Sequence, residues 1–148
     1  MIRKEYINTL NLLEKSSPIN FYDNKQLNDM AKKSRLKNKW NTCDSWNLFR
    51  PNNNKIYSIL NTDDSSKSGT HWVALFQNGN TLYVYDSFGR TKEYLMKQFN
   101  DWMNRNNYKV VFVNKKGDQN GKQLNCGLRS LLWLIFVDKY GLTKCKNI

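Results

Sequence analysis

The segment from Gly127 to Tyr140 constrains the fold of this chain more than any other part of the sequence. Apolar side chains fill most of its positions, and the run from Leu131 to Val137 is unbroken. A helix that is apolar nearly all round is buried at the centre of a fold. The run is far shorter than the ~20 residues needed to span a bilayer. The sequence therefore predicts a buried central helix, which Cys126 opens and Gly141 caps at its C-terminus.

The rest of the chain has the patterns of shorter helices and strands. Apolar residues at helical spacing predict helices over 2–15 and 92–105, and Asp23 with Gln26 forms a capping-box pattern that opens a third. Apolar and β-branched runs predict strands over 56–60, 71–76, 81–85 and 108–113.

The dipeptide Asn78-Gly79 separates two of these strands and predicts an antiparallel hairpin. The 148 residues contain no internal repeat and no linker, and this length suits one domain. The sequence therefore predicts a single α+β domain over 1–148, with a mixed central sheet flanked by helices.

The chain is strongly basic, with 24 basic and 12 acidic residues and a formal net charge of +12. Such an excess favours polyanionic partners, above all nucleic acid. The 22 Asn and 18 Lys have A-rich codons, so a genome biased towards A and T is an alternative origin of the charge. One cluster can track a phosphate backbone, although a solvated helix end is the commoner explanation; its members are Lys32, Lys33, Arg35, Lys37 and Lys39.

Three cysteines and a single histidine limit the metal and redox chemistry. Cys43, Cys126 and Cys145 are far apart in the sequence, no Cys-x-x-Cys occurs, and His71 is the only histidine. A structural zinc site needs four ligands at short paired spacings, and a disulfide framework is typical of secreted chains. No apolar signal-peptide segment follows Met1. We therefore expect a soluble intracellular protein with free thiols and no metal site.

Cys126 lies where a polar loop meets the N-terminus of the predicted buried helix. Backbone N–H groups that lack helical partners there stabilise a thiolate and can donate to an oxyanion. A thiolate nucleophile also needs a base, and only His71 is available. His71 begins one predicted hairpin strand and Asp86 follows the other, so both fall at the open end of the hairpin. Asp86 is thereby placed to orient the imidazole.

Each of these residues also has a structural explanation. A cysteine at a helix start is most often a small buried hydrophobe, and a histidine beside a tryptophan can be a satisfied edge residue. Asp86, followed by Ser87 and Gly89, fits ordinary turn chemistry. The joint arrangement of His71, Asp86 and Cys126 favours nucleophilic catalysis over these separate explanations.

Four motifs carry a family resemblance: His71-Trp72-Val73-Ala74-Leu75, Tyr85-Asp86-Ser87-Phe88-Gly89, Gln119, and Asn125-Cys126-Gly127-Leu128. In this order they resemble the adenain-like cysteine proteases, the adenovirus-type maturation enzymes, within a wider group that includes the SUMO proteases. The resemblance covers about half the chain. It implies a papain-like α+β fold with the nucleophile at the N-terminus of the buried helix.

The resemblance also implies a role for each matching residue. His71 would be the general base and then the acid that protonates the leaving amine, Asp86 would orient it, and Cys126 would be the nucleophile. Gln119 would complete the oxyanion hole, with Gln123 as the competing candidate because it lies only three residues from the cysteine.

Two further residues would contact the substrate, namely Trp72 and Asn125. Trp72 would wall the active-site cleft, although a core role for its side chain is an equal alternative.

The implied substrates are viral capsid and core precursor proteins, cut after small residues at Gly-Gly-type sites during virion maturation. The implied location is the virion or the assembly site in the host cytoplasm or nucleus, without membrane contact. We expect a monomer that requires no cofactor, with DNA as an optional activator. A disulfide-linked peptide activator is not expected, because no cysteine lies between Asp86 and Cys126.

Two rival functions are also compatible with the sequence. One is a deubiquitinating or deSUMOylating protease on the same fold. The other is a non-enzymatic basic protein that binds nucleic acid through its lysines and exposed aromatic residues.

Overall fold

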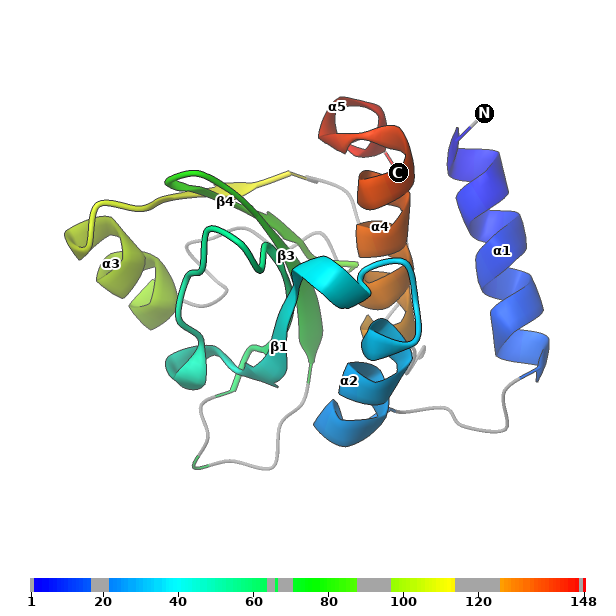
Figure 1. Ribbon diagram of the computed structural model, residues 1–148, viewed down its shortest axis with the longest axis horizontal. Helices are drawn as coiled ribbons and strands as arrows, with labels where there is room; N and C mark the ends of the chain where they lie inside the picture. The colour runs from blue at the N-terminus through cyan, green and yellow to red at the C-terminus, as the bar shows by residue number, and fades with distance from the viewer. Residues whose placement is uncertain are drawn as a thin grey trace.

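Among the residues that the structure describes, five strands form one mixed sheet (Figure 1). The computed structural model describes residues 2–16, 22–63, 66, 71–87, 97–113, 126–146 and 148. In sheet order the strands are β1 (Trp40–Ser45), β2 (Tyr57–Asn61), β3 (Trp72–Asn78), β4 (Thr81–Tyr85) and β5 (Lys109–Phe112). β1 runs parallel to β2 and β4 parallel to β5, whereas β3 is antiparallel to both of its neighbours. The predicted mixed sheet is confirmed.

A two-residue turn closes the β3–β4 hairpin. Asn78 pairs with Thr81, which leaves Gly79 and Asn80 as the turn. Gly79 has a φ of 59°, in the left-handed region that glycine adopts without a steric penalty. The predicted antiparallel pairing is confirmed, and β3 continues two residues beyond its predicted end at Phe76.

Successive residues of β3 enter two different hydrophobic cores. Trp72 and Ala74 belong to one cluster, whereas Val73 and Leu75 belong to the other. This is the period of two that places neighbouring strand residues on opposite faces of a sheet. Both faces of the sheet are therefore apolar, and each needs a helical cover.

Helices cover both faces of the sheet, and Figure 1 shows them on its two sides. On one face α4 packs against β3, α1 packs against α4, and α2 packs against both β1 and α4. On the other face α3 packs beside β5. The helices are α1 (Ile2–Ser16), α2 (Asn24–Lys32), α3 (Lys97–Arg105), α4 (Cys126–Tyr140) and the short α5 (Leu142–Cys145).

The buried helix α4 begins at Cys126 and ends at Tyr140, as the apolar pattern predicts. Eleven of its residues are buried. The N–H of Gly141 donates to the C=O of Val137 at 2.8 Å, and Gly141 has a φ of 89°. The helix lies on one face of the sheet, between β3 and α1. The short helix α5 was not predicted, since four residues are too few to show a helical period.

The two N-terminal helices begin where the sequence predicts them to begin. The capping box of α2 is confirmed, because Gln26 N–H donates to Asp23 Oδ1 at 2.8 Å and Asp23 N–H to Gln26 Oε1 at 2.9 Å. In α1, Tyr6 and Leu10 are buried against α4, but Leu13 is 36% exposed.

The helix α3 carries Phe99 and Met103 into the second core. It begins at Lys97 among the described residues. The first part of its predicted range, 92–96, lies outside the described residues, and so does the predicted polar loop over 114–125.

All three cysteines are free thiols, as predicted, and all three are buried. Burial raises the pKa of Cys145 to about 11, and burial together with Asp44 and Asp23 raises the pKa of Cys43.

The described part of the chain contains no cluster of three or more His, Cys, Asp or Glu side chains able to hold a metal ion. None of its helices combines the length and the apolar character that crossing a membrane needs.

Candidate active site

Cys126 occupies the first position of α4 and is 4% exposed. The first turn of a helix has backbone N–H groups without helical acceptors, so the sulfur lies at the positive end of the helix dipole. The backbone N–H of Trp72 donates to Cys126 Sγ at 3.4 Å. The start of α4 is therefore hydrogen-bonded directly to β3.

His71 and Asp86 meet at the open end of the β3–β4 hairpin. Nε2 of His71 lies 2.5 Å from Oδ1 of Asp86, and both side chains are almost fully buried. At its open end the hairpin ladder stops at the pair Ala74 and Tyr85. His71 lies before this pair in the chain and Asp86 after it, so both are beyond the end of the ladder. The structure thus brings these two side chains together at the predicted end of the hairpin.

The surroundings of His71 favour its charged form. Burial lowers the pKa of His71, but hydrogen bonds to Asp86 and Cys126 and the negative charges of both groups raise it. The net result is a pKa above the usual value of 6.5. His71 therefore connects a thiol to a carboxylate in one buried chain of side chains. Such a chain can hold a thiolate beside an imidazolium, which is the pair that attack on a carbonyl carbon requires.

Trp72 lies in the core beside this chain. Its side chain belongs to the cluster around α4 and is 5% exposed. Its indole Nε1–H donates to the C=O of Tyr22 at 2.9 Å. Of the two alternatives for Trp72, the side chain occupies the core position, and its contact with a substrate stays a prediction.

The sequence agrees with one known family over most of its length. The family model described as "Adenovirus endoprotease" matches residues 45–147, more than two thirds of the chain. The chain belongs to the adenovirus endoprotease family. The family is one of cysteine peptidases, and the match includes His71, Asp86 and Cys126. No curated protein matches the sequence significantly.

Three predicted site residues lie outside the described residues, namely Gln119, Gln123 and Asn125. The choice between the two glutamines as oxyanion donor therefore stays open. The contact of Asn125 with substrate also stays a prediction.

The five residues predicted to contact nucleic acid are all exposed: Lys32, Lys33, Arg35, Lys37 and Lys39. Arg35 Nε donates to Asp138 Oδ2 at 2.7 Å. Burial raises the pKa of Asp138, but hydrogen bonds from Arg35 and Tyr57 together lower it by more, so the pKa lies below its usual value. Among the described residues the four lysines form no salt bridge. Their exposure fits a solvated helix end and a phosphate contact equally well.

One residue beside the site has no counterpart among the predicted functional residues. Ser130 is fully buried, and its Oγ donates to the C=O of Trp72 at 3.3 Å. A signal for it exists in the sequence, because Ser130 follows Cys126 by four residues and therefore shares its helical face. The spacing alone does not predict a role for Ser130, because the sequence does not show which segment packs against this face of the helix.

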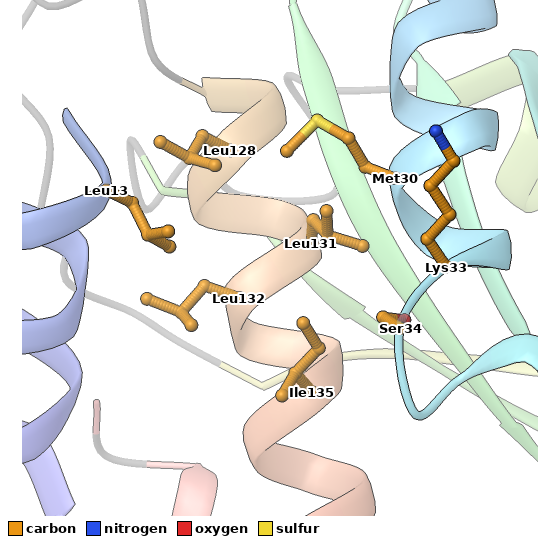
Figure 2. A pocket seen from close by; sticks show the side chains of 8 residues that line it. All are labelled: Leu13, Met30, Lys33, Ser34, Leu128, Leu131, Leu132 and Ile135. Carbon is orange, nitrogen blue, oxygen red and sulfur yellow. The ribbon is translucent and has the colours of Figure 1, made fainter. Parts of the chain in front are cut away.

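An apolar groove of about 300 Å³ lies between α1, α2 and α4 (Figure 2). Among the described residues that line it, Lys33 is the only charged one, and none is a cysteine or a histidine. The described lining of the groove therefore lacks the thiol and the imidazole that meet at Cys126 and His71. Its lining residues are Leu13, Met30, Lys33, Ser34, Leu128, Leu131, Leu132 and Ile135.

Proposed function

We propose that this chain is a viral cysteine endopeptidase that cleaves capsid or core precursor proteins after small residues, at Gly-Gly-type sites, during virion maturation. The observation that supports it best is the buried chain of Cys126, His71 and Asp86 at the junction of α4 and the hairpin. Membership of the adenovirus endoprotease family supports the same reaction class. We place the enzyme, as a monomer, in the virion or at the site of virus assembly.

In the first half of the proposed reaction, the Cys126 thiolate attacks the carbonyl carbon of the scissile peptide bond. The carbonyl electron pair moves onto oxygen and forms a tetrahedral oxyanion. When this intermediate collapses, the C–N bond breaks and the His71 imidazolium gives its proton to the leaving amine. The products are a free amine and a thioester on Cys126.

In the second half, neutral His71 takes a proton from water, and the resulting hydroxide attacks the thioester carbonyl. Collapse of the second tetrahedral intermediate breaks the C–S bond and releases the carboxylic acid. Cys126 leaves as a thiolate beside the imidazolium, so the starting pair is restored. Asp86 orients the imidazole throughout by accepting the Nε2–H hydrogen bond.

The oxyanion needs donors near the sulfur. The N-terminus of α4 supplies backbone N–H groups for this purpose, because Cys126 is its first residue. We assign the second donor to the side-chain amide of Gln119, with Gln123 as the alternative. Single Gln→Ala variants distinguish the two, since removing an oxyanion donor lowers kcat by about 10²- to 10³-fold.

Cleavage of a Gly-Gly peptide by wild-type protein and by Cys126→Ala tests the proposal. We expect the kcat of Cys126→Ala to fall by about 10⁴-fold or more, because the nucleophile is lost. Cys145→Ala is the matched control, since Cys145 is also a buried thiol but lies in α5. Equal cleavage by wild type and Cys126→Ala would contradict the proposal. Cleavage of a folded ubiquitin-like fusion, without cleavage of the peptide, would favour the deubiquitinating alternative.

We also propose that the exposed basic cluster after α2 contacts DNA as an activator. The support is electrostatic, because the cluster places five exposed cations close together in the sequence of a chain whose net charge is +12. In the double variant Lys37→Glu, Lys39→Glu, the slope of log affinity against log salt should decrease by about 2. Lys144→Glu, Lys146→Glu is the charge-matched control on α5 and the residue after it. An equal loss of DNA affinity in both double variants would mean that net charge alone is responsible.

A further inference from the structure

Trp72 meets α4 through both of its main-chain polar groups. Ala74 and Tyr85 are the last pair of the β3–β4 ladder, so Trp72 lies beyond its end. The N–H of Trp72 donates to Cys126 Sγ at 3.4 Å, and its C=O accepts from Ser130 Oγ at 3.3 Å. The N–H and C=O of one strand residue point to the same side, where an antiparallel neighbour would pair with both. The first turns of α4 therefore supply the hydrogen bonds that a longer β4 would have supplied.

The two partners come from a single helical face. Cys126 and Ser130 are four residues apart in α4, and this spacing stacks their side chains. Gly127 allows the close approach, because a Cβ there would lie 2.9 Å from Leu27 Cδ1 and 3.1 Å from Trp72 Cδ1. The helix start is thus held against Trp72 by two hydrogen bonds and a tight apolar contact.

The peptide group between His71 and Trp72 links this contact to the base. Its C=O accepts from the N–H of Thr62 at 2.9 Å, and its N–H donates to the Cys126 sulfur. Hydrogen bonds at the two ends of one peptide group polarise each other. Because the same peptide group carries the Cα atom of His71, a group that fixes it to α4 also fixes the point from which the imidazole extends, while Asp86 holds the ring itself.

We propose that Ser130 is a positioning residue for Cys126 and His71: its hydroxyl holds the Trp72 carbonyl and thereby keeps the Trp72 N–H directed at the Cys126 sulfur. The Ser130 hydroxyl is hydrogen-bonded to the Trp72 carbonyl and not to the Cys126 sulfur or the His71 ring among the described residues, so it acts through Trp72 and takes no part in the chemistry. We call the two hydrogen bonds, from Ser130 Oγ to the Trp72 C=O and from the Trp72 N–H to Cys126 Sγ, the Trp72 clamp. The catalytic consequence rests on the proposed peptidase function, whereas the clamp itself rests only on the contacts of Trp72.

The variant Ser130→Ala tests the proposal with Ser58→Ala as its matched control. Ser58 is also fully buried, but it lies on β2 and its hydroxyl has no hydrogen-bond partner among the described residues. The first measurement is amide hydrogen exchange at Trp72, followed by NMR. We expect exchange at Trp72 about tenfold faster in Ser130→Ala than in Ser58→Ala, because only the former loses the clamp. Equal exchange rates in the two variants would overturn the proposal.

The second measurement is the alkylation rate of Cys126 by iodoacetamide from pH 4 to 9, together with kcat and KM on a Gly-Gly peptide. In Ser130→Ala, the pH at which alkylation reaches half its maximal rate should move upward. Its kcat should fall by about tenfold with KM within about twofold, because small displacements of reacting groups act on the chemical step. An unchanged alkylation profile with kcat equal to that of Ser58→Ala would overturn the proposal.

These measurements separate the two proposals. If the wild type cleaves no peptide but Trp72 exchange depends on Ser130, the clamp stands and the peptidase function fails. If the wild type cleaves the peptide and Ser130→Ala matches Ser58→Ala in every readout, the peptidase function stands and the clamp fails.

Discussion

The α4 face and the α3 face of the sheet are covered by helices in different ways. On the α3 face, apolar side chains such as Phe99 and Met103 pack against Leu75 and Val84 in one apolar cluster. On the α4 face, similar packing is combined with hydrogen bonds from the backbone of Trp72 to the side chains of α4. All three cysteines belong to the cluster on that face.

This difference shows what a site adds to an ordinary hydrophobic core. Apolar packing is non-directional, so it holds α3 on the sheet without fixing any single atom. Hydrogen bonds are directional, so they can set a sulfur atom relative to a ring nitrogen. We therefore expect substitutions on the α3 face to change stability, and substitutions where α4 meets β3 to change activity.

The largest expected contrast is between Phe99→Ala and Cys126→Ser. Phe99 is 1% exposed, and its truncation should lower the free energy of unfolding by about 3–5 kcal/mol through lost packing. Cys126→Ser nearly preserves the size of the side chain and keeps an acceptor for the Trp72 N–H, so the free energy of unfolding should change by less than in Phe99→Ala while peptide cleavage is lost. Urea denaturation and kcat of the folded fraction measure the two effects. A large loss of kcat in folded Phe99→Ala would break the distinction between the faces.

A smaller effect is expected at Gly127, where a methyl group would meet Leu27 and Trp72. Overpacking of this kind costs about 1–3 kcal/mol, and it should also displace the start of α4 from β3. Gly127→Ala should therefore lower both the melting temperature and kcat. Gly79→Ala is the control, because Gly79 has a positive φ but open space around its Cβ position. It should lower the melting temperature and leave kcat unchanged; a fall in kcat there would mean that stability alone explains the loss in Gly127→Ala.

The smallest expected effect is a pH dependence of stability that comes from His71, beside the first residue of α4. The pKa of His71 in the fold lies above its usual value of 6.5, so the folded chain binds this proton more tightly than the unfolded chain. The resulting stabilisation is complete below pH 6.5 and disappears as the pH rises through the raised value. The free energy of unfolding should then fall by no more than about 1.4 kcal/mol per pH unit for this one proton.

The variant Asp86→Asn sharpens that measurement. It removes the charge that faces His71 Nε2 but keeps an acceptor oxygen at the same place. Urea denaturation between pH 6 and 9 should show a shallower decline in this variant than in the wild type. A decline of equal steepness would mean that Asp86 contributes no charge stabilisation to the imidazolium.

Several elements were predictable because their signals are local. The capping box of Asp23 and Gln26, the turn at Gly79 and the apolar helix after Cys126 each depend on residues close together in the sequence. The strand β1 was not predicted, because only Trp40 and Cys43 of its six residues are buried and they are three positions apart. This spacing does not follow the alternation by which a half-buried strand is recognised.

The sequence by itself determined the chemical candidates, since it contains one histidine, one cysteine at a helix start and one aspartate at the open end of the hairpin. Because successive residues of β3 are apolar, the sequence also determined that helices must cover both faces of the sheet. Only the tertiary structure decided that the indole of Trp72 lies in the core and that its backbone meets Cys126 and Ser130. The physical reason is that every residue except proline carries the same backbone N–H and C=O, so which of these groups finds a partner depends on how distant segments pack.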